Sequence, residues 1–438
     1  TRQGAATSSK GLFLIPNVQP GTYTLTVRLI GYTPVKRMVT VEGSTTDVNV
    51  ALEPATVELD EVLARADRPF SAASSSTIRA FDLTVRPVRS SQDLLQLTPG
   101  LITAQHAGGG KAEQIFLRGF DADHGTDVAI SVDGVPVNMV SHGHGQGYAD
   151  LHFLMPEVVE RIDVATGPYA AHFGNLATAG AIEFKTRDHL DENLIRLEGG
   201  QFNTAALTAL YQLPVEQDGH QGAYFGGQFY NTDGPVQAPQ RFQRFNLFGK
   251  FHTHINEQAR LSLSASGFSS AWDASGQIPV RAVEQGVIDR FGSIDDLEGG
   301  TTTRQDVNLT YTADQGNESF TIQGYASRYQ FKLFSNFTFF LEDPVNGDMI
   351  EQTDDRRSVG SNSRYRFTRA HDFAVTTTTL GGSLRADDAD VTLWKSPNRT
   401  RLAGLVDAQV VERNLSLWAQ QDLVFSSWIR LQLGLRGD

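Results

Sequence analysis

Residues 113–186 read EQIFLRGFDADHGTDVAISVDGVPVNMVSHGHGQGYADLHFLMPEVVERIDVATGPYAAHFGNLATAGAIEFKT. Short β-prone runs alternate in this stretch with glycine-containing turns, which is typical of a small compact domain. The residues that follow, up to position 438, form one segment after another of alternating apolar and polar side chains. A compact domain ahead of such a series predicts a unit that sits inside, or against, a large β-barrel.

The composition of the chain excludes several classes of protein. The chain has 438 residues, enough for two or three domains, and it has no cysteine, so disulfide and thiolate chemistry are excluded. The formal charge of −13, without a long basic run, argues against nucleic acid as a main partner. No apolar run reaches the roughly 18 residues of a membrane helix, but transmembrane β-strands escape such a search because only alternate residues face lipid.

The pattern divides the chain into four parts. They are a small β-sandwich at residues 1–54, a polar linker at 55–75, the compact domain at 76–188 and a long series of strands at 189–438. The strands of the first part are expected around Tyr23, Val39 and Val50. Thr1 is not an initiator methionine and no strand follows the strand-like end at 428–438, so we expect a chain that is cut at both ends.

The compact domain combines helix and strand signals. Residues 90–97 predict a helix with a serine as its cap. Three strands are expected, at residues 115–118, 127–132 and 161–164. Pro156 is placed to begin a short helix, and Asp133 with Gly134 forms the dipeptide of a tight turn. The domain is therefore expected to be α+β.

The region after residue 188 has the pattern of a transmembrane barrel. Phe245, Leu247 and Phe251 alternate with Asn246 and Lys250, and about ten such segments of about ten residues fit the length that a tilted strand needs to cross a bilayer. Short connections alternate with long ones, and the long ones are expected at residues 272–301 and 334–360. The polar residues would then face the lumen. A β-propeller is disfavoured because no repeat recurs at a fixed period.

Four motifs carry a resemblance to a known family. They are DLLQLTPGL at 93–101, IFLRGF at 115–120, VDGVPV at 132–137 and VERIDV…GP…FG…GAI between 159 and 182. In this order they resemble the plug of the TonB-dependent outer-membrane receptors. The residues that match are Arg118, Gly119, Asp133, Gly134, Glu160, Arg161, Gly167 and Gly174. The segment GLFLIPNVQPGTYTLTVRLIGYTP from residue 11 resembles a carboxypeptidase regulatory-like domain.

The resemblance implies a fold, a location and partners. The fold is mainly β: a partial regulatory-like sandwich, an α+β plug and the N-terminal part of an antiparallel barrel that has about 22 strands in the family. The expected location is the outer membrane of a Gram-negative-type cell, with the N-terminal part in the periplasm. The implied partners are TonB with its inner-membrane energising complex, outer-membrane lipid and a small nutrient.

The linker contains a segment that resembles a TonB box. It consists of Glu58, Leu59, Asp60, Glu61, Val62 and Leu63. Such a segment acts by strand addition, in which an extended peptide pairs with a sheet edge of the partner. The alternative is an ordinary interdomain linker.

Histidines gather in the compact domain. Imidazole is a common ligand of zinc, copper and nickel, and glycine lets two imidazoles on one loop approach one ion. The candidate ligands for substrate or metal are His124, His142, His144, His152, Asp121 and Asp123. The alternative is a wet polar loop whose histidines only form hydrogen bonds. Aromatic residues expected in the long loops are candidates for stacking on a chelator or sugar, or for the interfacial girdle: Trp272, Phe291, Phe339 and Phe340.

These features together predict an energy-coupled importer of a scarce nutrient. The expected substrate is a transition metal (zinc, copper or nickel) or a metal chelate such as an iron siderophore, carried as cargo rather than as a resident cofactor. A carbohydrate or another organic nutrient is the alternative. A passive pore or adhesin, which would not need the linker segment, and a metallohydrolase are less favoured. No enzyme is expected, because the chain lacks the distant ligands and helical scaffold of a metallohydrolase site.

Overall fold

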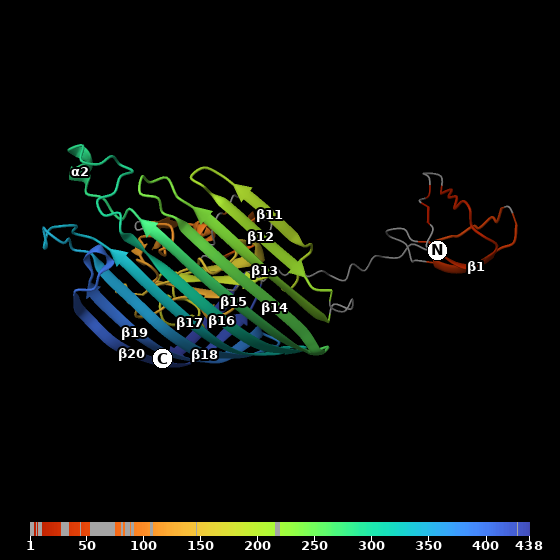
Figure 1. Cartoon of the computed structure of the whole chain (residues 1–438). Coiled ribbons are helices and arrows are strands. Elements are labelled where there is room, and N and C mark those ends of the chain that lie inside the picture. The colour runs from red at the N-terminus through yellow and green to blue at the C-terminus, as the bar shows by residue number, and fades with distance from the viewer. Residues whose placement is uncertain are drawn as a thin grey trace. The chain divides into compact units, whose positions relative to one another are not determined.

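The computed structural model describes residues 4–5, 7, 11–27, 35–43, 45–52, 75–79, 82–83, 88, 92–105, 108–145, 147–214, 220–426 and 428–438. The chain forms two compact units, Thr1–Asp67 and Arg68–Asp438. Figure 1 labels β1 in the first unit and strands β11 to β20 in the second. The predicted TonB-box residues 58–63 lie outside the described residues.

The first unit contains a two-stranded antiparallel sheet. Strand β1 (Gly21–Val27) pairs with β2 (Val35–Val41), so two of the predicted strands are present. The third expected strand, around Val50, is not a strand in the described residues. Its chain still follows the sheet, because the Arg37 Nη1 donates a hydrogen bond to the Asn49 carbonyl at 3.0 Å.

The compact domain is built on a five-stranded mixed sheet. Its strands, in spatial order, are β3 (Ser75–Arg79), β9 (Val159–Thr166), β10 (Gly180–Thr186), β7 (Val128–Val132) and β8 (Val135–Pro136). Only β10 and β7 pair in parallel; the other neighbours are antiparallel. The prediction of a linker up to residue 75 is wrong at its end, because Ser75 already belongs to β3 and pairs with Ala165.

A second, three-stranded sheet and two short helical turns complete the compact domain. The sheet consists of β4 (Leu101–Ala104), β5 (Gln114–Leu117) and β6 (Phe120–Asp121). The helix predicted at 90–97 is only a 3₁₀ turn, η1 (Asp93–Leu97), and its N-cap Gln92 makes no capping hydrogen bond. The predicted turn at Pro156 is present as η2 (Pro156–Val158), which leads directly into β9.

Two motif dipeptides are explained by backbone conformation. Arg118 and Gly119 have φ of 49° and 90°, and Asp133 and Gly134 have φ of 46° and 80°. Each pair closes a two-residue hairpin, β5–β6 or β7–β8. A tight hairpin turn of this hand needs positive φ at both central residues, which glycine adopts without strain. The motifs therefore specify local geometry.

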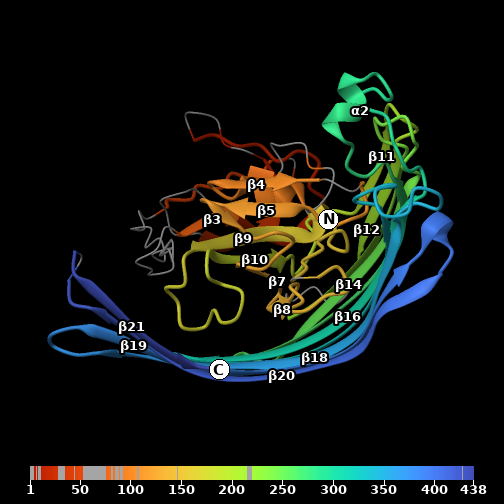
Figure 2. The same cartoon turned by 90° about the vertical axis from the view of Figure 1, so that its left-hand side faces the viewer.

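The region after residue 193 is one antiparallel sheet of eleven described strands in sequence order. They are β11 (Leu194–Gly199), β12 (Ala205–Gln212), β13 (Gln221–Thr232), β14 (Phe242–Asn256), β15 (Ala259–Ala274), β16 (Glu298–Gln315), β17 (Glu318–Ser335), β18 (Ile350–Ala370), β19 (Val375–Lys395), β20 (Ala403–Val424) and β21 (Arg430–Gly437). Figure 2 shows that the sheet is strongly curved and holds the compact domain on its concave side. The described sheet is open, with β11 and β21 at its edges.

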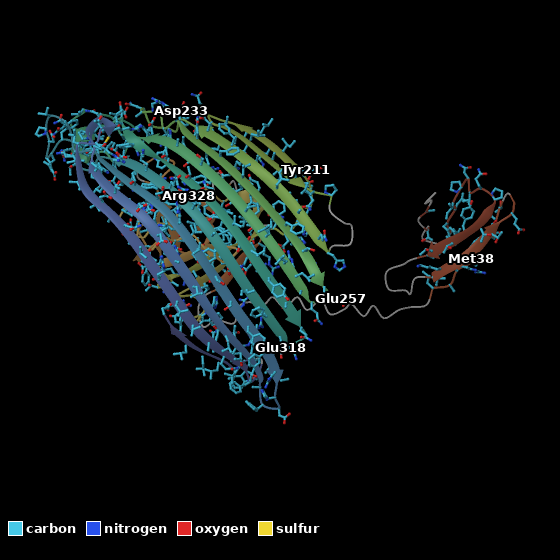
Figure 3. The ribbon with its side chains drawn as sticks, turned by 60° about the horizontal axis from the view of Figure 1, so that its bottom comes forward. Met38, Tyr211, Asp233, Glu257, Glu318 and Arg328 are labelled. Atoms are coloured by element: carbon cyan, nitrogen blue, oxygen red, sulfur yellow. The ribbon has the colours of Figure 1, made fainter. Side chains whose placement is uncertain are left out.

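The two faces of this sheet have the predicted alternation. Phe245, Leu247 and Phe251 are exposed, whereas Asn246 and Lys250 between them are buried toward the compact domain. An outward apolar face with polar residues inward is the pattern of a membrane barrel. In Figure 3, Glu257 and Glu318 lie at one end of the strands and Asp233 at the other.

The strands are longer and the loops shorter than predicted. Strand lengths rise to 22 residues in β20, against the expected ten. The long connections shrink to residues 275–297, which carry the helix α2 (Val280–Glu284), and 336–349. Both lie at the end of the sheet that we call the loop end. The opposite, turn end has two-residue connections such as 316–317. No helix in the described part of the chain is long and apolar enough to span a membrane.

Candidate functional site

One segment of the compact domain, residues 133–144, is held along the inner wall of the curved sheet. We call it the wall segment. Its backbone carbonyl oxygens accept hydrogen bonds from wall side chains at almost every second residue. The donors are Gln323 to Asp133 (2.6 Å), Asn362 to Gly134 (3.1 Å), Arg304 to Pro136 (3.4 Å), Arg385 to Asn138 (2.9 Å), Arg356 to Ser141 and Gln352 to Gly143 (3.2 Å). The wall thus binds the backbone of the segment along its length, in addition to side-chain contacts such as those of Met139 and His142.

The wall segment crosses from the middle of the sheet to its loop end. Asp133 lies near Gln323, the sixth residue of β17 counted from the turn end. Gly143 contacts Gln352, the third residue of β18 counted from the loop end. The segment therefore brings residues 141–144 to the side where the long loops lie.

A buried ionic network holds the loop-end part of the wall segment. The Arg356 side chain is 1% exposed and pairs with Asp354 at 3.1 Å, with Asp387 at 3.6 Å and with Glu412 at 3.4 Å. Asp354 in turn accepts a hydrogen bond from the Gly143 amide at 3.1 Å. Buried charges need partners of this kind, because removal from water is costly for an unpaired ion.

Gly143 has a steric reason to be glycine. A Cβ at this position would lie 2.5 Å from the Thr353 carbonyl oxygen, an atom of the wall backbone that cannot easily move. The central glycine of His-Gly-His therefore allows close approach to the wall. It also sets His142 and His144 on either side of that contact.

His142 faces inward and uses both ring nitrogens. Its Nδ1 accepts a hydrogen bond from the His144 amide at 3.1 Å, which places the proton of the neutral ring on Nε2, 3.3 Å from the Tyr329 hydroxyl. The ring stacks on Tyr148, with centroids 4.2 Å apart. Burial lowers the pKa of His142 well below its ordinary value, so the ring is neutral at physiological pH. This arrangement favours a packing role over the predicted role in metal binding.

Three other predicted residues come together. Asp123 and His124 follow β6, and His144 lies in the loop after β8, yet their ligating atoms all lie within 4.8 Å of one another. The His124 Nε2 is 3.7 Å from the Asp123 carboxylate, and the rings of His124 and His144 meet edge to face at 4.6 Å. His124 is buried, whereas the other two are half-buried.

Lys111 adds a buried cation to this group. Its Nζ lies 3.0 Å from the His144 Nε2, and its side chain is fully buried. Burial lowers the pKa of Lys111 to about 8, although the charges of Asp123 and Glu298 act in the opposite direction. Sequence reasoning missed Lys111 and the central Tyr148, because a single lysine after three glycines and a single tyrosine match no ligand motif.

The remaining predicted candidates lie outside this group. His152 is buried, 2.7 Å from the Asp150 carboxylate and 2.9 Å from the Gln92 amide. Asp121 is exposed and accepts a hydrogen bond from the Asp123 amide at 3.0 Å, which orients the loop. Both residues therefore support the loops that carry the group.

The aromatic candidates fall into two sets. Trp272 is not in a loop as predicted: it lies on β15, is 3% exposed and packs on the compact domain, where a Cβ on Gly110 would lie 2.1 Å from its ring. Phe291 and Phe340 are exposed in the two long loops, and Phe339 is half-buried beside Phe340. Only the loop residues fit a role in contacting a ligand from outside.

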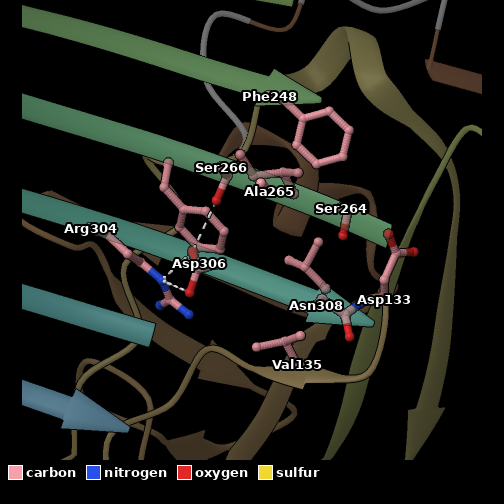
Figure 4. Close-up of a pocket in the computed structure, with 12 residues that line it drawn as sticks. Asp133, Val135, Phe248, Ser264, Ala265, Ser266, Arg304, Asp306 and Asn308 are labelled. Atoms are coloured by element: carbon pink, nitrogen blue, oxygen red, sulfur yellow. Dashed lines mark hydrogen bonds and ion pairs between the residues drawn. The ribbon is translucent and has the colours of Figure 1, made fainter. Parts of the chain in front are cut away.

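A small cavity lies between the β7–β8 hairpin and the strands β14–β16 (Figure 4). Arg304 crosses it, with its guanidinium 4.2 Å from the centre of the Phe153 ring and its Nε bonded to both oxygens of Asp306. Ser266 also donates to Asp306. The cavity is lined by both the compact domain and the wall, so it is part of their interface. The charges of Arg304 and Asp306 inside it are paired with each other.

Sequence families and known proteins match this chain in parts. Residues 69–181 match the TonB-dependent Receptor Plug Domain, and residues 1–64 match the CarboxypepD_reg-like domain. The Vitamin B12 transporter BtuB from Vibrio vulnificus strain YJ016 is 25% identical over 215 residues, which are 45% of this chain and 32% of that protein. The chain thus spans about a third of the length of this curated relative.

Solved structures share the fold. The unliganded ferric citrate transporter FecA superposes with a TM-score of 0.68 at 15% identity, over 83% of this chain and 56% of that chain. The siderophore receptor PirA from Acinetobacter baumannii gives 0.62 at 18% identity, over 84% and 56%. The predicted fold, a plug beside an antiparallel barrel sheet, is confirmed, and the compact domain is called the plug below. The relatives named here are a transporter of vitamin B12, a transporter of ferric citrate and a siderophore receptor.

Proposed function

We propose that this chain, a TonB-dependent receptor with an N-terminal CarboxypepD_reg-like domain, a plug and part of a β-barrel, lies in the outer membrane and imports a scarce nutrient by energy coupling. The substrate is a transition metal or a metal chelate. The observation that carries the proposal is the position of the wall segment. Its residues 141–144, which we call the histidine loop, lie at the loop end of the barrel wall.

The outer surface of the sheet supports the proposed location. Its exposed side chains are apolar on strand after strand, as for Leu207, Phe229, Leu309 and Leu417. A surface of this kind is stable against lipid and unfavourable in water. The two long loops then belong on the outside of the cell, and the turn end faces the periplasm.

The plug is seated in a way that is compatible with movement. Most contacts of the wall segment are hydrogen bonds to amide and guanidinium groups, each with a net contribution of about 1 kcal/mol because water offers similar partners. A polar interface can exchange its partners for water one at a time. Movement of the plug also requires that its apolar contacts with the wall be broken, such as those of Met139 and Tyr148 with Trp272 and Phe331.

Energy would be delivered at the N-terminal side of the plug. We propose that residues 58–63 add as a strand to a sheet edge of TonB. The first described strand of the plug, β3, is an edge strand that pairs only with β9 over five residues. Tension on the linker would therefore act first on the β3–β9 pairing.

An organic nutrient is the second candidate, favoured by one observation. Phe291 and Phe340 are exposed in the long loops, where flat rings can stack on a sugar or an aromatic chelator. Competition experiments distinguish the two candidate substrates. An organic nutrient would be displaced by sugars that bind at these loops, whereas a metal substrate would be displaced by metal ions that bind at the histidines.

The energy-coupling proposal is tested by replacing residues 58–63 with a Gly-Ser segment of equal length in the receptor expressed in its host. We expect uptake of radioactive zinc to fall to the level of protonophore-treated cells, while binding to the cell surface persists. A replacement of residues 53–57, next to the segment, is the matched control and should retain uptake. Undiminished uptake by the first variant would point to a passive pore.

A further inference from the structure

We propose that Asp123, His124 and His144 form a binding site for a divalent late transition-metal ion of the zinc, nickel and copper group, and that the Lys111 ammonium takes the place of the ion in the metal-free protein. The ligating atoms of these three residues already lie within 4.8 Å of one another on the plug. That the ion is the cargo of the receptor rests on the proposed function, whereas the binding of the ion does not.

The donor set selects the class of ion. Two imidazoles and one carboxylate suit zinc, copper and nickel, whereas magnesium and calcium prefer an all-oxygen shell. Zinc–nitrogen bonds of about 2.0–2.1 Å in a tetrahedral site place neighbouring ligand atoms about 3.3 Å apart. The group therefore needs to contract by no more than about 1.5 Å to close on an ion.

His144 is the member of the group whose side chain we expect to move when an ion binds. It lies between Gly143 and Gly145 in a turn closed by the hydrogen bond from the Gly145 amide to the His142 carbonyl at 2.8 Å. The ring is half-buried, and Gly145 has nothing within 4 Å of a Cβ position. Rotation about the side-chain bonds of His144 moves its ring while the backbone hydrogen bonds of the turn, including the one from the His144 amide to the His142 ring, stay in place.

The other two ligands are held in place by the plug. The Asp123 backbone amide donates a hydrogen bond to the Asp121 carboxylate at 3.0 Å. The Asp123 carboxylate accepts a hydrogen bond from the Gln114 side-chain amide at 3.3 Å. The His124 carbonyl accepts a hydrogen bond from the Ala149 amide at 2.6 Å. Partners of this kind orient metal ligands and raise affinity. Two fixed ligands and one that closes make a site that can take up and release its ion.

Lys111 gives the group a cation when no metal is present. Its Nζ is 3.0 Å from the His144 Nε2, so it donates to an atom that would otherwise face an ion. The Lys111 side chain is fully buried against the His144 imidazole, within the group that also contains the Asp123 carboxylate. An incoming metal ion must displace this ammonium. The fourth position is then open for water or for a ligand that the metal carries with it.

No second group of this kind occurs among the described residues. His220 and His254, whose rings are 5.7 Å apart, lie at the turn end of the wall; the His252 ring is 6.5 Å from that of His254, but these three histidines do not form a ligand group like the one on the plug. They provide an internal comparison, because adventitious binding by paired histidines would occur there as well.

Calorimetric titration of the full receptor in detergent with zinc, and separately with nickel and magnesium, tests the site. We expect one zinc per chain and no binding of magnesium. His144→Ala should weaken the affinity for zinc at least about 100-fold, because even the loss of a residue that only hydrogen-bonds to a metal ligand lowers metal affinity about 10- to 100-fold. Asp123→Asn should weaken it as well. The matched control His254→Ala should bind zinc as the wild type does.

Lys111→Met distinguishes a metal site from a polar network. We expect zinc to bind more tightly to this variant, because the competing ammonium is gone. Unchanged or weaker binding would overturn the role given to Lys111. Zinc binding that is lost in His254→Ala but kept in His144→Ala would overturn the site itself, as would the absence of zinc binding to the wild type.

Failure of the site and failure of the proposed function give different results. If zinc binds at His144 but its uptake survives replacement of residues 58–63, the site stands and energy coupling falls. If zinc does not bind while another nutrient is taken up only with residues 58–63 intact, the function stands and the metal site falls.

Discussion

The two ends of the wall segment are held by different chemistry. The turn at Asp133 and Gly134 is bound by the amide side chains of Gln323 and Asn362, with Lys250 3.4 Å from the Asp133 carboxylate. The loop at residues 141–144 is bound by a cluster of charges around the buried Arg356. The turn at residues 133–134 is specified by its own sequence and is held by few polar contacts. The loop at residues 141–144 depends on charges that come from several strands of the wall.

Removal of the central charge should have the largest effect on the second end. Arg356→Ala leaves Asp354 buried without its guanidinium partner, and the expected loss of unfolding free energy is about 3–5 kcal/mol. The measurement is chemical denaturation in detergent. Arg328→Ala is the control, because Arg328 pairs with Asp355 at 3.5 Å on the exposed face, where such pairs contribute about 0–1 kcal/mol. Equal losses would mean that the buried cluster does not hold the loop.

A methyl group on Gly143 should have an intermediate effect. Gly143→Ala places a Cβ 2.5 Å from the Thr353 carbonyl, so the loop must lift from the wall at an expected cost of about 1–3 kcal/mol. Limited proteolysis of the histidine loop reports the lifting, and Gly267→Ala, with open space around its Cβ, is the control. A protected loop in Gly143→Ala would show that the wall yields instead.

The smallest effect is expected at the turn. Gly134→Ala forces an alanine to a φ of 80°, which costs about 1–2 kcal/mol, and its Cβ meets only the flexible end of Gln323. Gly316→Ala, at a φ of 59° in a wall turn with open space, measures the backbone cost alone. The difference in unfolding free energy between the two variants isolates the contact with Gln323. A loss that exceeds the one caused by Arg356→Ala would reverse the comparison.

The comparison also explains which features the sequence could predict. The alternation of Phe245, Asn246 and Leu247 depends only on the two-residue period of a strand, and the Asp-Gly turn depends only on local φ. The predicted strand lengths were too short because strand pairing continues into the regions predicted as loops, as where Trp272 of β15 pairs with Gly300 of the neighbouring β16. That register is set by a distant strand and leaves no local signal.

The candidate site was predictable in its residue types and not in its grouping. His124, Asp123 and His144 were among the predicted residues, but so were His142 and His152, which form hydrogen bonds elsewhere. His142 is kept out of the group by two tyrosines. Its ring stacks on Tyr148 and forms a hydrogen bond with Tyr329. These contacts join residues up to 187 positions apart.

The wall segment has a consequence for how such a receptor can change over time. Because the wall binds carbonyl oxygens of this segment, a side chain that does not itself pack on the wall, unlike those of Met139 and His142, is not fixed by the need to seat the plug. A new side chain at position 144 alters what the plug presents to the outside and leaves the docking contacts in place. If residue 144 contacts the cargo, as proposed, cargo preference and attachment are separable traits in this molecule, and the first can drift under selection while the second is preserved, with Gly143 as the point where the two constraints coincide.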